Sequence, residues 1–224
     1  VWDCCLESNP RTNALERGTN RNVEGNHMTE SIKMDRINHL LVIGGTGMLS
    51  QAALTLAAHS DAISIVARTR KSLDSLGSRL LDSPVVYNPI QIDYQSTALL
   101  EKALQAAIES YGPIDLVVAW IHSNAPDVPL IVASIAAEKS LAVDFFHVLG
   151  SSSADPQSVP NPIELRLREI PDLIYHKVIL GFVIEGGDSR WLTNQEISRG
   201  VIDAVSADAP EHVVGVIRPL SMRP

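Results

Sequence analysis

An apolar segment that runs directly into a cluster of glycines constrains the fold of this chain more than any other feature. Residues 40–43 are Leu-Leu-Val-Ile, and residues 44–47 are Gly-Gly-Thr-Gly. Glycine lets the backbone turn sharply and approach another group closely. Residues 49–59 then read as a helix, whose first N–H groups favour an anion such as phosphate. The spacing fits a dinucleotide-binding fingerprint with Ser50 in place of the third glycine, and a plain strand-to-helix turn is the alternative.

The same region must be weighed as a membrane span, because residues 40–60 contain no Asp, Glu, Lys or Arg. Glycines in the middle of the segment, the polar Gln51 and Thr55 after it, and the lack of a one-sided basic flank argue against a span. A net charge of −8 argues against nucleic acid as a partner. We therefore expect a soluble protein that binds neither membrane nor nucleic acid. The sequence leaves the oligomeric state open, a homo-oligomer included.

The first part of the chain differs from the rest. Residues 1–35 are rich in Asn, Arg, Thr and Glu and show no helical or strand period, so we expect a disordered N-terminal extension there and a folded domain over residues 36–224. The chain has two cysteines, Cys4 and Cys5, which are adjacent and lie outside the expected core. They provide no disulfide framework, which fits a reducing cytoplasm.

From residue 40 onward, strand-like and helix-like segments alternate. The pattern predicts strands over residues 40–43, 63–67, 90–93, 114–121, 143–149, 178–184 and 213–217. Helices are predicted between them, over residues 49–59, 72–81 and 97–110, from Asp127 and Pro129, and after a capping box at residues 193–196. This alternation predicts an α/β fold with a doubly wound parallel sheet, the Rossmann fold, in a single domain.

Ligands of such a sheet bind beyond the carboxyl ends of the strands, so the residues that follow each strand matter most. After the second strand, where an NAD site has an acidic residue for the ribose hydroxyl, the sequence has Arg68 and Thr69. A guanidinium there suits a 2′-phosphate and favours NADP(H); a solvated helix start is the alternative. After the third strand, Asp93 and Tyr94 either contact adenine or form the turn that starts a helix.

At this point residues 40–217 resemble the short-chain dehydrogenase/reductase superfamily. The resemblance rests on three segments. Asp93 falls where that family has its adenine-contacting Asp, and residues 115–118 look like the strand before its Asn-Asn-Ala-Gly motif. The resemblance implies a cofactor site made by the glycine turn (Gly44, Gly45, Thr46, Gly47, Met48 and Leu49) and by the residues that replace the Asn-Asn-Ala-Gly motif (Ala119, Trp120 and Ile121).

The family's catalytic Tyr-x-x-x-Lys motif has no counterpart. The four tyrosines, Tyr87, Tyr94, Tyr111 and Tyr175, are followed four residues later by Gln, Ala, Asp and Ile. Tyr175 and Lys177 precede the predicted sixth strand, so we expect them near its amino end, away from the cofactor. Residues 185–190 follow that strand and either line a substrate pocket or simply turn.

Three polar residues at strand ends are better catalytic candidates. His122 follows the fourth strand, where nicotinamide and substrate meet in the superfamily, and an imidazole there can deliver a proton. Ser151 and Ser152 follow the fifth strand, and a hydroxyl there can hydrogen-bond a substrate carbonyl. The sequence shows no metal-binding spacing of Cys and His. It favours an NADP(H)-dependent oxidoreductase for a small carbonyl-like substrate; a catalytically silent NADP(H) sensor or scaffold is the alternative.

Overall fold

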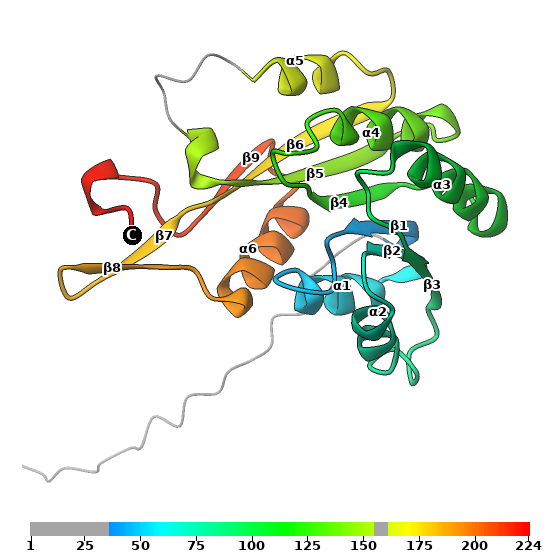
Figure 1. Ribbon diagram of the computed structural model, residues 1–224, viewed down its shortest axis with the longest axis horizontal. Helices are drawn as coiled ribbons and strands as arrows, with labels where there is room; N and C mark the ends of the chain where they lie inside the picture. Colours follow the sequence, from blue (N-terminus) through cyan, green and yellow to red (C-terminus); the bar gives the residue numbers. More distant parts are fainter. Residues whose placement is uncertain (1–35, 155–160) are drawn as a thin grey trace, which may run out of the picture. The chain divides into compact units, whose positions relative to one another are not determined.

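The computed structural model describes residues 36–154 and 161–224 (Figure 1). The extension expected over residues 1–35 lies outside these described residues. The described residues from 36 onward belong to one compact unit. Among them, no helix has the length and apolar character needed to cross a membrane.

A seven-stranded parallel sheet forms the centre of the fold, in the order β3-β2-β1-β4-β5-β6-β9. This order confirms the doubly wound α/β fold in one domain. It reverses direction between β1 and β4, the place where such sheets bind ligands. The strands are β1 (Ile37–Ile43), β2 (Ser60–Ala67), β3 (Val86–Gln91), β4 (Leu116–Trp120), β5 (Val143–Gly150), β6 (Leu173–Leu180) and β9 (Glu211–Val214).

Helices cover both faces of the sheet (Figure 1). One face carries α1 (Ser50–Ala57), α2 (Arg70–Gly77) and α6 (Asn194–Ala207); the other carries α3 (Thr97–Tyr111), α4 (Val128–Glu138) and α5 (Pro162–Arg168). Two short 3-10 helices, η1 (Ser151–Ala154) and η2 (Leu220–Met222), follow β5 and β9. Because each face is covered, the central strands are mostly apolar, and β4 is apolar along its whole length.

Side chains of β1 show how one strand supplies two cores. Leu40 and Val42 pack toward α1, whereas Leu41 and Ile43 pack toward α3 and α4. All four are buried. Burial of each such side chain contributes about 1.5–3 kcal/mol, so this strand anchors the glycine turn at its end to both layers.

Two helix ends agree with the sequence analysis. α6 begins with the predicted capping box, in which Thr193 and Glu196 satisfy each other's backbone N–H groups. α3 ends at Gly112, whose φ of +90° suits glycine. These signals are local, which explains why the sequence alone revealed them.

The strand predicted over residues 178–184 is wrong at both ends. β6 begins five residues earlier, at Leu173, and stops at Leu180. A Cβ at Gly181 would lie 2.1 Å from the carbonyl oxygen of Val216, so two backbones meet there and the chain leaves the sheet. It continues as a separate hairpin of β7 (Phe182–Glu185) and β8 (Asp188–Trp191). Residues 185–190 therefore lie around the turn of a hairpin, with Gly186 and Gly187 as the turn itself, which agrees with one of the two expected outcomes.

The bounds of two further strands also differ from the prediction. β3 begins at Val86, before the predicted residue 90, and β9 ends at Val214, before the predicted residue 217. Gly215, with a φ of +75°, ends β9. The missed parts are residues 86–89 (Val-Tyr-Asn-Pro) and residues 211–212 (Glu-His), and neither contains a continuous apolar run that would predict a strand.

Candidate functional site

The glycine turn joins β1 to α1 at the carboxyl edge of the sheet. Gly44 has a φ of +78°, and a Cβ on it would lie 3.0 Å from the carbonyl oxygen of Trp120. A Cβ on Gly45 would lie 2.7 Å from a methyl carbon of Val42. At Gly47, by contrast, a Cβ would meet nothing within 4 Å. The first two glycines are thus required by packing, and the third leaves open space beside the backbone.

Hydrogen-bond donors of this turn are free. Among the described residues, none accepts a hydrogen bond from the backbone N–H groups of residues 45–49. The turn itself is held in place because the Ser198 hydroxyl on α6 donates to the Met48 carbonyl over 2.7 Å. Free N–H groups at the start of a helix form an anion site. The observed turn therefore fits the pyrophosphate of a dinucleotide.

A pocket of about 240 Å³ lies beside the turn. Most predicted cofactor residues meet here; the predicted ones in its lining are Gly44, Thr46, Gly47, Met48, Arg68, Tyr94, Trp120 and His122. Arg68 is exposed at the end of β2. The Tyr94 hydroxyl accepts a hydrogen bond from the backbone N–H of His122 at 3.3 Å, which ties the segment after β3 to the end of β4.

Six predicted cofactor residues do not line this pocket, and one of them, Ile121, lines the second pocket described below. Leu49 and Ala119 are buried in the core, and Gly45 packs against Val42. The Thr69 hydroxyl lies 2.6 Å from that of Ser72, within the first turn of α2. Asp93 accepts a hydrogen bond from the Gln95 N–H at 3.1 Å, the arrangement of a turn that starts a helix.

A second pocket, of about 320 Å³, lies between the ends of β4 and β5 and the start of α5. It shares Trp120 and His122 with the first. Their rings contact edge to face, with centroids 5.6 Å apart. The two pockets thus meet at this pair of side chains. The predicted residues Ile121 and Ser152 also line the second pocket.

The two predicted serines differ in their surroundings. Ser152 is exposed and lines the second pocket. Ser151 is 7% exposed, and its hydroxyl has no hydrogen-bond partner among the described residues. An unsatisfied buried hydroxyl costs about 1–3 kcal/mol. Ser151 therefore has the character of a group that is completed by a ligand or a water molecule.

His147 and Tyr175 form a buried pair that the sequence analysis missed. His147 lies on β5 and lines the second pocket, and its Nδ1 is 3.2 Å from the Tyr175 hydroxyl. Burial lowers the pKa of His147 to about 4, with Glu164 opposing this shift and Lys177 adding to it. The expectation that Tyr175 precedes the sixth strand is wrong, because β6 begins at Leu173 and pairs Tyr175 with Phe145. The sequence signal that could have pointed to this pair is His147 itself, a histidine within the mostly apolar strand predicted over residues 143–149.

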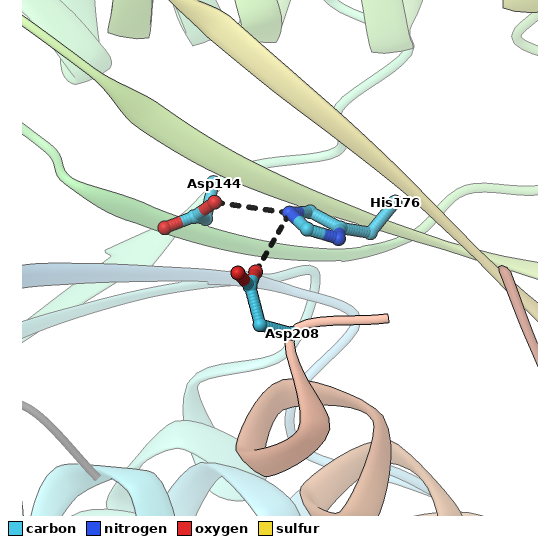
Figure 2. A group of neighbouring side chains, drawn as sticks. All are labelled: Asp144, His176 and Asp208. Carbon is cyan, nitrogen blue, oxygen red and sulfur yellow. Dashed lines mark hydrogen bonds and ion pairs between the residues drawn. The ribbon is translucent and has the colours of Figure 1, made fainter. Parts of the chain in front are cut away.

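Figure 2 shows a different cluster, at the amino ends of the strands. His176 Nε2 lies 2.9 Å from a carboxylate oxygen of Asp144 and 3.5 Å from one of Asp208. Burial lowers the pKa of His176, but the hydrogen bonds with Asp144 and the Ala209 carbonyl, together with both carboxylate charges, outweigh it and raise the pKa.

The same three side chains have the spacing of a metal site, which was not predicted from the sequence: their ligand atoms all lie within 4.8 Å of one another. In the observed geometry the imidazole hydrogen-bonds to Asp144 and forms an ion pair with Asp208, so the polar groups of the cluster satisfy one another. The cluster lies at the sheet edge opposite the two pockets.

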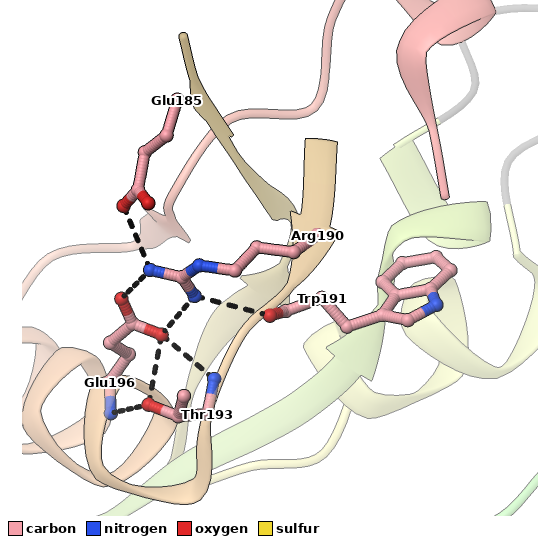
Figure 3. Close-up of polar contacts among 5 residues, drawn as sticks. All are labelled: Glu185, Arg190, Trp191, Thr193 and Glu196. Carbon is pink, nitrogen blue, oxygen red and sulfur yellow. Dashed lines mark hydrogen bonds and ion pairs between the residues drawn. The ribbon is translucent and has the colours of Figure 1, made fainter. Parts of the chain in front are cut away.

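Figure 3 shows the ion pairs that hold the β7–β8 hairpin. Arg190 contacts Glu196 at 2.9 Å and Glu185 at 2.9 Å. Hydrogen bonds from Arg190 and Thr193 hold the pKa of Glu196 at about 2. The same carboxylate thus caps α6 and fixes the hairpin to the start of that helix.

Comparison with known proteins adds evidence on the fold. No model of a protein family matches the sequence, and no curated protein matches it. A short-chain dehydrogenase/reductase from Serratia marcescens matches with a TM-score of 0.60 and 13% identity, over 80% of this chain and 96% of that one.

Two further solved structures agree with the first. A short-chain dehydrogenase/reductase from Brucella melitensis, described as a glucose/ribitol dehydrogenase, has a TM-score of 0.62 and 16% identity, over 83% of this chain and 100% of that one. A short-chain dehydrogenase from Burkholderia cenocepacia in complex with NADP has a TM-score of 0.60 and 12% identity, over 81% and 96%. At these identities the likeness shows the fold, a Rossmann-like sheet shared with short-chain dehydrogenases.

Proposed function

We propose that this chain is an NADP(H)-dependent oxidoreductase of the short-chain type that acts on a small carbonyl-like substrate. The observation that carries the proposal is the meeting of two pockets at Trp120 and His122. One pocket borders the free N–H groups of the glycine turn, and the other is large enough for a small molecule. A reaction between a cofactor and a substrate requires such adjoining sites.

Each part of the cofactor has residues suited to it. The turn of residues 44–48 would hold the pyrophosphate, and Arg68 would pair with the 2′-phosphate through its planar guanidinium. Tyr94 and Trp120 would border the adenine and nicotinamide halves of the pocket, in that order along the sheet. When bound, the cofactor supplies a hydride to a carbonyl carbon, and the carbonyl oxygen takes up a proton.

Polar groups of the second pocket would handle that proton. His122 is exposed where the two pockets meet, so its imidazole can take a proton from solvent and give it to the substrate oxygen. Ser152 at the pocket wall can hydrogen-bond the same oxygen. Ser151 precedes it in the chain and has an unsatisfied hydroxyl among the described residues, but it does not line the pocket. These groups replace the Tyr-x-x-x-Lys arrangement, which the sequence lacks.

The proposal is tested by NADPH oxidation with a panel of neutral aldehydes, ketones and quinones, beside calorimetric titration of NADPH alone. We expect micromolar NADPH binding and turnover of at least one panel member. If NADPH does not bind, the proposed function is wrong.

A second candidate function, a catalytically silent NADP(H) sensor or scaffold, is favoured by the missing Tyr-x-x-x-Lys motif. The same experiment separates the two, because a sensor binds NADPH with no turnover across the panel.

A further inference from the structure

The second pocket contains a hydrogen-bond donor for which the proposed function has no role so far, the imidazole of His147. We infer that this pocket binds an uncharged carbonyl compound, whose oxygen accepts a hydrogen bond from Nε2–H of His147, with Tyr175 as the positioning residue. The inference rests on the proposed function for the identity of the site and extends it to substrate class. Four features of the described residues support it.

The first is the hydrogen bond between the two rings. The distance between Tyr175 Oη and His147 Nδ1 is 3.2 Å. No other described residue accepts a hydrogen bond from the Tyr175 hydroxyl, so this buried O–H is satisfied only if it donates to Nδ1. A neutral imidazole that accepts at Nδ1 carries its proton on Nε2.

The second is the position of that proton. His147 lines the pocket although it is only 4% exposed, and no hydrogen bond joins its Nε2 to any described residue. An N–H donor with no acceptor among the described residues can donate to a ligand or to a water molecule. The donor is therefore available to a molecule in the pocket.

The third is the way in which Tyr175 is fixed. Its ring stacks on Phe145 with centroids 6.4 Å apart, and the guanidinium of Arg168 lies 4.9 Å above it. Tyr175 does not line the pocket itself. It acts on a ligand only through the orientation and protonation of His147.

The fourth is the absence of charge. No Asp, Glu, Lys or Arg is found among the described residues that line the pocket. The charges that act on His147 are those of Glu164 and Lys177, which pair with each other at 3.3 Å. Glu164 also pairs with Arg168 at 3.0 Å. While His122 is neutral, an ionised ligand would lose its water without gaining a counter-charge, which is costly. An uncharged ligand with one acceptor is the class that fits.

The test measures binding in the absence of NADPH, with three probes of similar shape. Acetophenone has a ring and a carbonyl, ethylbenzene lacks the carbonyl, and 4-acetylbenzoate adds a carboxylate. Dissociation constants are obtained by ligand-observed NMR on the full chain. One neutral hydrogen bond is worth about 0.5–1.5 kcal/mol, so acetophenone should bind about two- to tenfold tighter than ethylbenzene. 4-Acetylbenzoate should bind more weakly than acetophenone.

Variants then test whether the preference for acetophenone over ethylbenzene depends on His147 and Tyr175. In the double variant His147→Phe/Tyr175→Phe both partners become apolar, a change that is commonly near neutral for stability. We expect it to bind acetophenone and ethylbenzene equally. Tyr175→Phe alone should reduce the preference, and His59→Gln, a change in a histidine at the opposite sheet edge, should keep it. Imidazole nitrogen shifts of the wild type should show His147 protonated at Nε2.

Three results would overturn the inference: equal binding of the two neutral probes by the wild type, tighter binding of 4-acetylbenzoate than of acetophenone, or a proton on Nδ1. NADPH is titrated separately. If NADPH does not bind but acetophenone still binds more tightly than ethylbenzene, only the proposed function is overturned. If NADPH binds but the two neutral probes bind equally, only this inference is overturned.

Discussion

At the scale of single residues, His122 connects the two halves of the site because it lines both pockets. Its backbone N–H is fixed by Tyr94, and its ring rests edge to face on Trp120. His147, by contrast, is buried and neutral near pH 7, since burial lowers its pKa to about 4. The exposed imidazole therefore suits proton delivery, and the buried one suits a fixed hydrogen bond.

This division of roles predicts the effect of removing His122. Positioned acid–base groups contribute about 10²–10⁴ in rate, so His122→Ala should lower kcat of NADPH oxidation by about that factor. NADPH affinity, measured by calorimetry, should change little. Asn124→Ala, two residues further in the same exposed segment, is the matched control and should keep kcat. An unchanged kcat in His122→Ala would remove this residue from the mechanism.

At the scale of elements, the ends of helices and strands determine where the site residues lie. α6 holds the glycine turn through Ser198, and its own start is held by the capping box of Thr193 and Glu196. The first turn of α3 is different, since the side chain of Ser96 at its start makes no capping hydrogen bond.

The contrast predicts unequal costs for two similar substitutions. Loss of a capping side chain costs about 0.5–2 kcal/mol, so Thr193→Ala should lower the free energy of unfolding by roughly that amount. Ser96→Ala should lower it by much less. Urea unfolding of both variants beside the wild type gives the comparison, and equal losses would show that the capping box contributes nothing particular to α6.

The amino ends of β5 and β6 predict a pH dependence of stability. The pKa of His176 in the folded chain is raised above its ordinary value of 6.5 by Asp144, Ala209 and Asp208, despite burial. The protonated imidazole therefore stabilises the folded chain. This stabilisation is fully present below the pKa of His176 in the unfolded chain, and it is lost as pH rises through the pKa of His176 in the folded chain.

Unfolding by urea across a pH series from about 6 to about 9 brackets this titration. The wild type should lose stability relative to His176→Gln as pH rises through the range. If the free energies of unfolding of the wild type and of His176→Gln change in parallel with pH, the pKa of His176 is not raised in the folded chain. The variant keeps a hydrogen-bonding side chain that does not titrate, so the difference isolates the charge on His176.

At the scale of the whole molecule, the sequence predicted the fold and where part of the candidate site lies, while the roles of its residues stay predictions. Apolar runs, the glycine turn and helix caps are local signals, and they were sufficient for the parallel sheet and for the position of Arg68, His122 and Ser152 at strand ends. The pair of His147 and Tyr175 could not be predicted, because it depends on the register between β5 and β6. The sequence pattern also misplaced the start of β6, since His176 and Lys177 interrupt the apolar run in its first half.

The central claim is that the pocket beside the glycine turn binds NADP(H), with Arg68 on the 2′-phosphate. Calorimetric titration of NADPH and NADH into the wild type, Arg68→Ala and Arg70→Ala tests it most directly. Arg70 is the matched control, because its guanidinium is paired with Asp74 at 2.9 Å. A charge-assisted contact is worth about 1.5–3 kcal/mol, so the wild type and Arg70→Ala should prefer NADPH roughly tenfold to a hundredfold, and Arg68→Ala should not. Equal affinity of the wild type for the two cofactors, or a preference that survives Arg68→Ala, would contradict the account.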